Sequence, residues 1–230
     1  MMTRMSKRFK QRLGITIALA VAIAFGVLSN FFYGEWLLSP GEMTPGHENL
    51  SCKMCHQNAP GSMRQQLQAK TQFWLGNREK DVELGFSQVG NSRCQSCHQR
   101  PKDRHPVYRF LEPRFKKVRQ ELAPQFCASC HREHRAQRVS MSPSACKACH
   151  AKLSLKRDPL TITHKSLVEK KQWNTCLGCH DYHGNHKLKS PSLILGRIKE
   201  QEILEYFGAG DTPYPLPKKY KAKEKLDNES

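Results

Sequence analysis

Five copies of the pattern Cys-x-x-Cys-His constrain this 230-residue chain more than any other feature of its sequence. The chain has ten cysteines, and every one belongs to a copy of this pattern. The cysteine pairs are Cys52 and Cys55, Cys94 and Cys97, Cys127 and Cys130, Cys146 and Cys149, and Cys176 and Cys179. The histidines that follow them are His56, His98, His131, His150 and His180. The fold must therefore place five chemically equivalent groups.

This spacing suits the covalent attachment of haem. Positions i, i+3 and i+4 share one face of a helical turn, so two thiols can form thioethers with a porphyrin while the histidine binds its iron. A disulfide framework gives no reason for a histidine after every second cysteine. Zinc sites take four ligands, which five cysteine pairs cannot share evenly, and a redox dithiol occurs once per domain. We therefore predict five covalent haems, with the motif histidines as proximal iron ligands.

An apolar stretch at residues 14–38, uncharged before Glu35, is long enough to cross a bilayer. Basic residues without any acidic one precede it, which predicts a cytoplasmic arm at residues 1–13 and a periplasmic remainder at a bacterial inner membrane. The aromatic residues Phe31, Phe32, Tyr33 and Trp36 are then expected at the outer interface. A cleaved signal peptide is the alternative, but the stretch is long and has no small-x-small site at its end.

The rest of the chain is polar and has few residues for a hydrophobic core, because many of its apolar residues lie in the N-terminal stretch. We predict a mainly α fold with extensive loops, in which a domain at residues 39–190 is built around five haems. Helices are expected over residues 113–123 and 192–207. Residues 191–230 should form a C-terminal helix and a basic tail, extended or mobile from residue 213.

Six histidines remain after the five motif histidines are subtracted from the eleven in the chain. They are His47, His105, His134, His164, His183 and His186. Five irons each need a second axial ligand, so this count predicts haems held by two histidines, with one histidine to spare. Methionine is the alternative ligand, offered by Met43, Met54, Met63 and Met141. Two axial ligands leave no open position on iron, which indicates electron transfer and no catalytic residue.

The five motifs resemble class III multihaem cytochromes c, together with His47-Glu-Asn-Leu-Ser-Cys52, Thr163-His164-Lys165 and the run from Cys176 to His186. The resemblance covers about residues 47–190. In that family histidines just before or soon after a motif commonly supply distal ligands, which favours His47, His164 and His183; His105, His134 and His186 are candidates by count. More loosely, the chain resembles soluble pentahaem donors of periplasmic nitrite reduction. Its layout also resembles membrane quinol dehydrogenases of nitrate and nitrite respiration, which usually carry four haems.

The chain carries a formal charge of +18, and 33 basic against 19 acidic residues follow position 38. A basic surface suits an acidic redox partner, while a periplasmic location argues against nucleic acid. We therefore expect a membrane-anchored relay in anaerobic or alternative respiration. It would pass electrons from the quinol pool or a quinol-oxidising complex to a periplasmic redox protein. The alternatives are a quinol dehydrogenase that feeds a periplasmic reductase and a haem subunit of a larger membrane respiratory complex.

Overall fold

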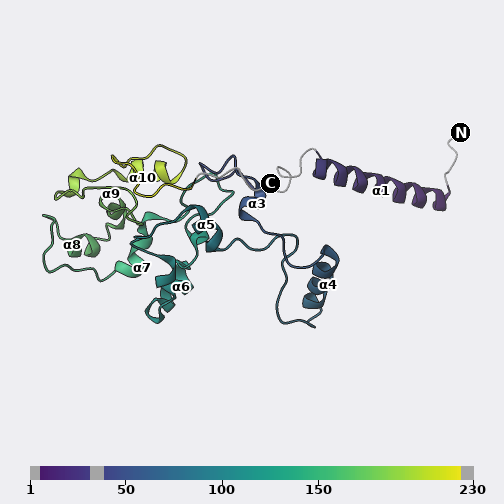
Figure 1. Cartoon of the computed structure of the whole chain (residues 1–230), viewed down its shortest axis with the longest axis horizontal. Helices are drawn as coiled ribbons and strands as arrows, with labels where there is room; N and C mark the ends of the chain where they lie inside the picture. Colours follow the sequence, from purple (N-terminus) through teal and green to yellow (C-terminus); the bar gives the residue numbers. More distant parts are fainter. Residues whose placement is uncertain (1–5, 32–38, 224–230) are drawn as a thin grey trace. The chain divides into compact units, whose positions relative to one another are not determined.

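The computed structural model describes residues 6–31 and 39–223, and the chain divides into two compact units, residues 1–41 and 42–230 (Figure 1). The first unit contains helix α1 (Lys7–Phe31), whose side chains are exposed as far as residue 28. Among the described residues it is the one helix long and apolar enough to cross a membrane. The helix begins seven residues before the predicted span, inside the predicted basic arm. Phe32, Tyr33 and Trp36 lie outside the described residues.

The second unit consists of short helices joined by long loops, and residues 42–223 contain no strand. This confirms the prediction of a mainly α fold with extensive loops. The α-helices are α3 (Cys52–Cys55), α4 (Met63–Trp74), α5 (Asn91–Cys97), α6 (Lys116–Leu122), α7 (Lys147–His150), α8 (His164–Glu169), α9 (Cys176–Cys179) and α10 (Glu200–Phe207). Single 3₁₀ turns cover Val107–Leu111, Pro113–Phe115, Cys127–Ser129, Pro143–Cys146, Trp173–Thr175 and Ile194–Gly196.

The two helices predicted outside the motifs are present with one correction. The first runs through the Pro113–Phe115 turn into α6, and ends at Ala123 in the left-handed conformation (φ 47°, ψ 46°). The second ends at Phe207 before Gly208, as predicted, but α10 begins only at Glu200 instead of Ser192. The reason is that the backbone N–H of Ile198 donates to the carbonyl of Gly178 (3.0 Å), and Arg197 and Lys199 on either side of it are extended.

The hydrophobic core of the second unit is small and lies near its C-terminal end. Leu177 of α9, Ile203 of α10 and Tyr214 are buried together, and Ile203 is only 1% exposed. The partly buried residues around them are Leu188, Ile198, Tyr206 and Phe207. Protein side chains therefore supply little of the buried surface that a domain of this length requires.

The predicted tail is extended as far as it is described, and it packs on the rest of the unit. The backbone N–H of Lys219 donates to the carbonyl of Asn185 (2.8 Å), and that of Tyr220 donates to the Asn185 side chain (2.9 Å). The N–H of Lys223 donates to the carbonyl of Cys97 (3.0 Å). Residues 213–223 thus connect the fifth motif region to the second motif.

We expect Gly178→Ser to lower the melting temperature of the holoprotein, with a loss of stability of about 1–3 kcal/mol. A Cβ at Gly178 would overlap the carbonyl oxygen of Ile198, which belongs to the backbone and cannot rotate away. Gly90→Ser is the matched control, because a Cβ there meets nothing closer than the Ser92 hydroxyl at 4.0 Å and serine suits a helix N-cap. Calorimetry that gave both variants the same melting temperature would contradict this close packing.

Candidate haem-binding sites

Each of the five motifs lies on a helical turn. Helices α3, α5 and α9 carry the first, second and fifth motifs, and the third and fourth use the turns at Cys127–Ser129 and Pro143–Cys146, the latter continuing into α7. In four motifs the backbone N–H of the histidine donates to the carbonyl of the first cysteine, at 2.8–2.9 Å. This bond closes one turn, so the two thiols and the imidazole lie on the same side of it. None of the ten cysteines forms a disulfide.

Each motif histidine faces one of the six remaining histidines. The distances between ring centroids are 6.4 Å for His56 and His134, 5.8 Å for His98 and His47, 6.0 Å for His131 and His183, 6.2 Å for His150 and His105, and 6.1 Å for His180 and His164. Two imidazoles that bind one metal from opposite sides, each about 2 Å from it, place their centroids roughly 6 Å apart. All five pairs therefore fit an iron between two axial imidazoles.

His186 faces no motif histidine and belongs to the C-terminal core instead. Its ring stacks on Tyr214 at a centroid distance of 4.2 Å, and its Nδ1 lies 3.2 Å from a carboxylate oxygen of Asp181. Burial raises the pKa of Asp181, but the hydrogen bonds from His186 outweigh it and lower that pKa to about 2. The count of six candidates did not distinguish His186 from the others, because its role depends on residues 28 positions further along the chain.

Four of the five pairs join a motif to a loop that belongs to another motif. His47 precedes the first motif but faces the second, and His134 follows the third but faces the first. His105 follows the second motif and faces the fourth, and His183 follows the fifth and faces the third. Only His164 faces the next motif in the chain. Nearness in sequence was therefore a poor guide to which histidine meets which motif.

A second layer of residues, which the sequence analysis missed, orients these imidazoles through Nδ1. Three carboxylates take this position: Glu133 for His47 (2.7 Å), Asp158 for His164 (2.9 Å) and Asp103 for His183 (2.9 Å). Two backbone carbonyls do the same: Tyr182 for His105 and Arg138 for His131, both at 2.6 Å. An Nδ1–H that donates to such a partner leaves Nε2 as the nitrogen free to bind iron. The sequence could have suggested Glu133 and Asp103, because each lies within two residues of a candidate histidine. It could not have shown that they orient His47 and His183, which are distant in sequence.

The carboxylate beside His47 is held in its ionised form. Burial raises the pKa of Glu133, but the hydrogen bonds from His47 and Thr44 outweigh it and lower that pKa to about 2. The same two effects act on Asp103, where the hydrogen bond from His183 lowers the pKa against the effect of burial. These imidazoles therefore face a full negative charge at neutral pH.

Contacts between neighbouring sites follow the order of the motifs. Helix α3 contacts α5, and the Asn91 side chain joins the second motif to the third, donating to Gln125 (2.6 Å) and accepting from the N–H of Cys127 (2.9 Å). Tyr182 joins the third to the fourth. Its ring stacks on His105 (4.3 Å, 15° between planes) and meets the edge of His183 (5.0 Å). The fourth and fifth motifs lie side by side through the Pro143–Cys146 turn and α9.

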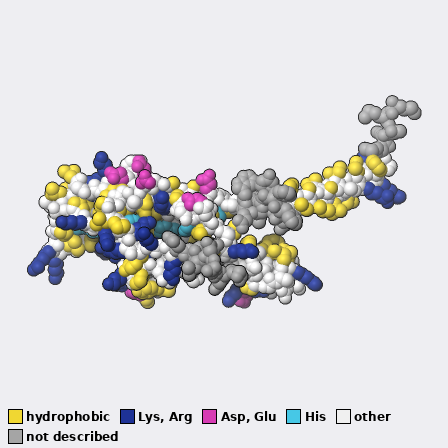
Figure 2. Space-filling view, turned by 45° about the horizontal axis from the view of Figure 1, so that its top comes forward, with side chains coloured by type: hydrophobic (Ala, Val, Ile, Leu, Met, Phe, Trp, Pro, Cys, Tyr) yellow, Lys and Arg dark blue, Asp and Glu magenta, His cyan; other side chains and the backbone are white. Residues whose placement is uncertain are grey.

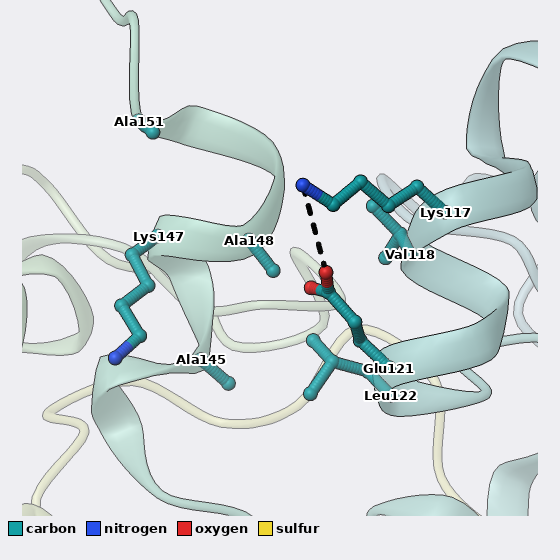
Figure 3. Close-up of a pocket in the computed structure, with 8 residues that line it drawn as sticks. All are labelled: Lys117, Val118, Glu121, Leu122, Ala145, Lys147, Ala148 and Ala151. Atoms are coloured by element: carbon teal, nitrogen blue, oxygen red, sulfur yellow. Dashed lines mark ion pairs between the residues drawn. The ribbon is translucent and has the colours of Figure 1, made fainter.

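Two cavities lie beside motifs. One of about 330 Å³ separates α6 from α7 and is lined by Val118 and Leu122 on one side and Ala145, Ala148 and Ala151 on the other (Figure 3). It contains none of the candidate site residues. The other, of about 570 Å³, opens beside His56 and Phe86 of the first site.

Thiol pairs on helical turns, each with an imidazole facing a second one, define a multihaem cytochrome c. Residues 44–151, which include the first four motifs, match the family described as Cytochrome c3. This match supports a multihaem electron-transfer protein that binds haem c covalently. No curated protein and no solved structure matches the chain.

Replacing Glu133 with Gln should destabilise the holoprotein by about 1–2 kcal/mol, because a neutral amide replaces a charged acceptor opposite His47 Nδ1. The pKa of Glu133 falls from 4.5 to about 2 on folding, so this stabilisation is complete above pH 4.5 and is lost as the pH falls toward 2. Thermal melting of wild type and Glu133→Gln at several pH values measures the difference.

The matched control is Glu112→Gln, which removes an exposed carboxylate paired with Arg114 (2.8 Å) and should cost much less. A stability difference for Glu133→Gln that does not change between pH 7 and pH 3 would contradict the assigned role.

Proposed function

We propose that the chain binds five haems c, one at each motif, and that each iron is held by the pair of histidines described above. The observation that carries this proposal is the set of five centroid distances between 5.8 and 6.4 Å, each joining one motif histidine to one other histidine. Histidine is thus proposed over methionine at all five distal positions, and His186 is the histidine to spare.

Haem supplies one-electron redox chemistry, and the protein supplies ligands, spacing and electrostatics. Two imidazoles on each iron leave no position at which oxygen, nitrite or sulfite could bind, which supports electron transfer over substrate reduction. The contacts between successive sites support a linear order, in which the first and fifth haems are the ends and Tyr182 lies at the junction between the third and fourth sites.

We further propose that α1 anchors the protein in a bacterial inner membrane, with its N-terminus in the cytoplasm and the haem domain in the periplasm. The support is the apolar length of α1 and the basic residues Lys7, Arg8, Lys10 and Arg12 in its first turns. The protein then relays electrons in anaerobic or alternative respiration from a membrane donor, the quinol pool or a quinol-oxidising complex, to a periplasmic redox protein.

The surface charge supports an acidic partner. Figure 2 shows Lys and Arg side chains scattered across the visible face of the second unit, with fewer Asp and Glu side chains among them. Such a surface favours fast, transient and salt-sensitive association with an acidic protein.

Substituting the six histidines one at a time tests the ligand assignment. His47→Gln, His105→Gln, His134→Gln, His164→Gln and His183→Gln should each convert one haem per molecule from low spin to high spin. His186→Gln should leave every haem in the low-spin state, although its stability will fall because the stack on Tyr214 is lost. Near-infrared magnetic circular dichroism counts the low-spin haems, and intact mass spectrometry counts the attached haems. A high-spin haem in His186→Gln, or none in one of the other five variants, would refute the assignment.

The relay function is tested with the full-length holoprotein in lipid nanodiscs. A reduced viologen should reduce all the haems, and added nitrite should not be consumed. A menaquinol analogue alone should reduce the haems slowly or not at all, and a quinol-oxidising membrane complex should restore fast reduction. Fast reduction by the analogue alone would instead favour the quinol dehydrogenase, and consumption of nitrite would refute a pure carrier.

A further inference from the structure

Helix α4 exposes a stripe of apolar side chains that the proposed function does not explain. The helix lies in the loop between α3 and α5, the longest interval between two motifs (Figure 1). Met63, Leu67 and Trp74 fall on one side of it and are 55%, 52% and 72% exposed, and Leu75 follows at 66%. Large apolar side chains clustered on one exposed face indicate a contact surface.

An ordinary surface helix buries its apolar face, whereas α4 packs on its own loop through a polar side chain and leaves its apolar face exposed. Gln66 is only 6% exposed, and its amide donates to the carbonyls of Ala59 and Gly61, both at 3.0 Å. The Gln66 carbonyl accepts from the N–H of Gly85 (2.9 Å). Ser62 and Gln65 form a capping box at the start of the helix. These bonds fix the helix with Leu67 and Trp74 turned outward.

The cavity at the first site does not include this stripe. The cavity beside His56 is lined by Lys70, Val82, Leu84 and Phe86 among others, and by none of Met63, Leu67, Trp74 or Leu75. The stripe therefore lies outside this cavity and is open to a partner.

We propose that this face of α4 docks into the headgroup region of the lipid bilayer, as a second membrane contact beside the anchor. The inference rests on the proposed function in one respect, namely that α1 spans a membrane. An anchored chain keeps α4, which begins 32 residues after α1 ends, tethered to one bilayer. Trp74 and Leu67 suit the boundary between headgroups and acyl chains, where tryptophan is enriched.

The charges around the stripe fit anionic headgroups. The exposed basic side chains Arg64, Arg78 and Lys80 belong to this helix and the loop after it, together with the exposed acids Glu79 and Glu83, while Lys70 is paired with Asp81 at 2.6 Å. The Lys70 ammonium also lies 5.9 Å from the Trp74 ring. Basic residues beside an apolar helix face are typical of helices that lie in the membrane interface. Lys70 and Asp81 also line the cavity beside His56. Such docking would therefore hold the first haem site at a fixed height over the membrane.

Photocrosslinking on the full-length holoprotein in nanodiscs of phosphatidylethanolamine and phosphatidylglycerol tests the proposal. Trp74→p-benzoylphenylalanine should yield lipid adducts on irradiation, at least tenfold more than the matched control Tyr108→p-benzoylphenylalanine. Tyr108 is also aromatic and is 71% exposed, against 72% for Trp74. Mass spectrometry identifies the adducts, and the haem spectrum verifies that each variant is folded. A probe at Leu67 replaces the one at Trp74 if that variant does not assemble.

A third probe, Ile23→p-benzoylphenylalanine in α1, separates this inference from the anchor. Adducts at positions 23 and 74 support the inference. Adducts at 23 without adducts at 74, or crosslinks from 74 to a second copy or to haem, overturn it and leave the anchor intact. No adduct at position 23 refutes the anchor and, with it, the inference.

Discussion

The pairing of imidazoles across the motifs is the interaction on which the second unit depends. Four of the five histidine pairs connect a motif to a loop from another part of the chain, so each site fixes the path of the polypeptide around its neighbours. The core formed by side chains is small and centres on Ile203. A porphyrin offers several hundred square ångströms of apolar surface, about 25 cal/mol for each square ångström buried. Haem attachment and folding are then one process, and we expect the apoprotein to be unfolded or molten.

The residues that accept a hydrogen bond from imidazole Nδ1 differ among the five sites, and this difference can give the haems different redox potentials. Glu133, Asp158 and Asp103 place a carboxylate on Nδ1, whereas His105 donates to a backbone carbonyl. A carboxylate increases the basicity of a metal-bound imidazole more than a neutral carbonyl does, and so favours the oxidised metal. With the ligands as proposed, the fourth haem would have a higher potential than the second, third and fifth from this effect alone. Equivalent motifs can therefore carry unequal haems.

The two ends of the proposed haem series have different surroundings. The first site adjoins the loop that carries α4 and its exposed apolar stripe. The fifth site adjoins the small C-terminal core, where Arg138 also donates to the carbonyls of Tyr206 and Gly210. The two ends therefore differ in the surfaces they offer, while Tyr182 contacts His105 and His183 between them.

The sequence by itself determined the covalent chemistry, because the thiols and the following histidine of each motif act within one helical turn whatever the rest of the chain does. It also predicted the lack of strands, the apolar span and the end of α10 at Gly208, all of which depend on local patterns. It did not determine the start of α10, since the bond from Ile198 to Gly178 joins distant segments. Only the tertiary structure decided which histidine faces which motif, that His186 stacks on Tyr214, and that Glu133 orients His47. Those contacts span up to 86 residues and depend on how the loops cross, which no local spacing records.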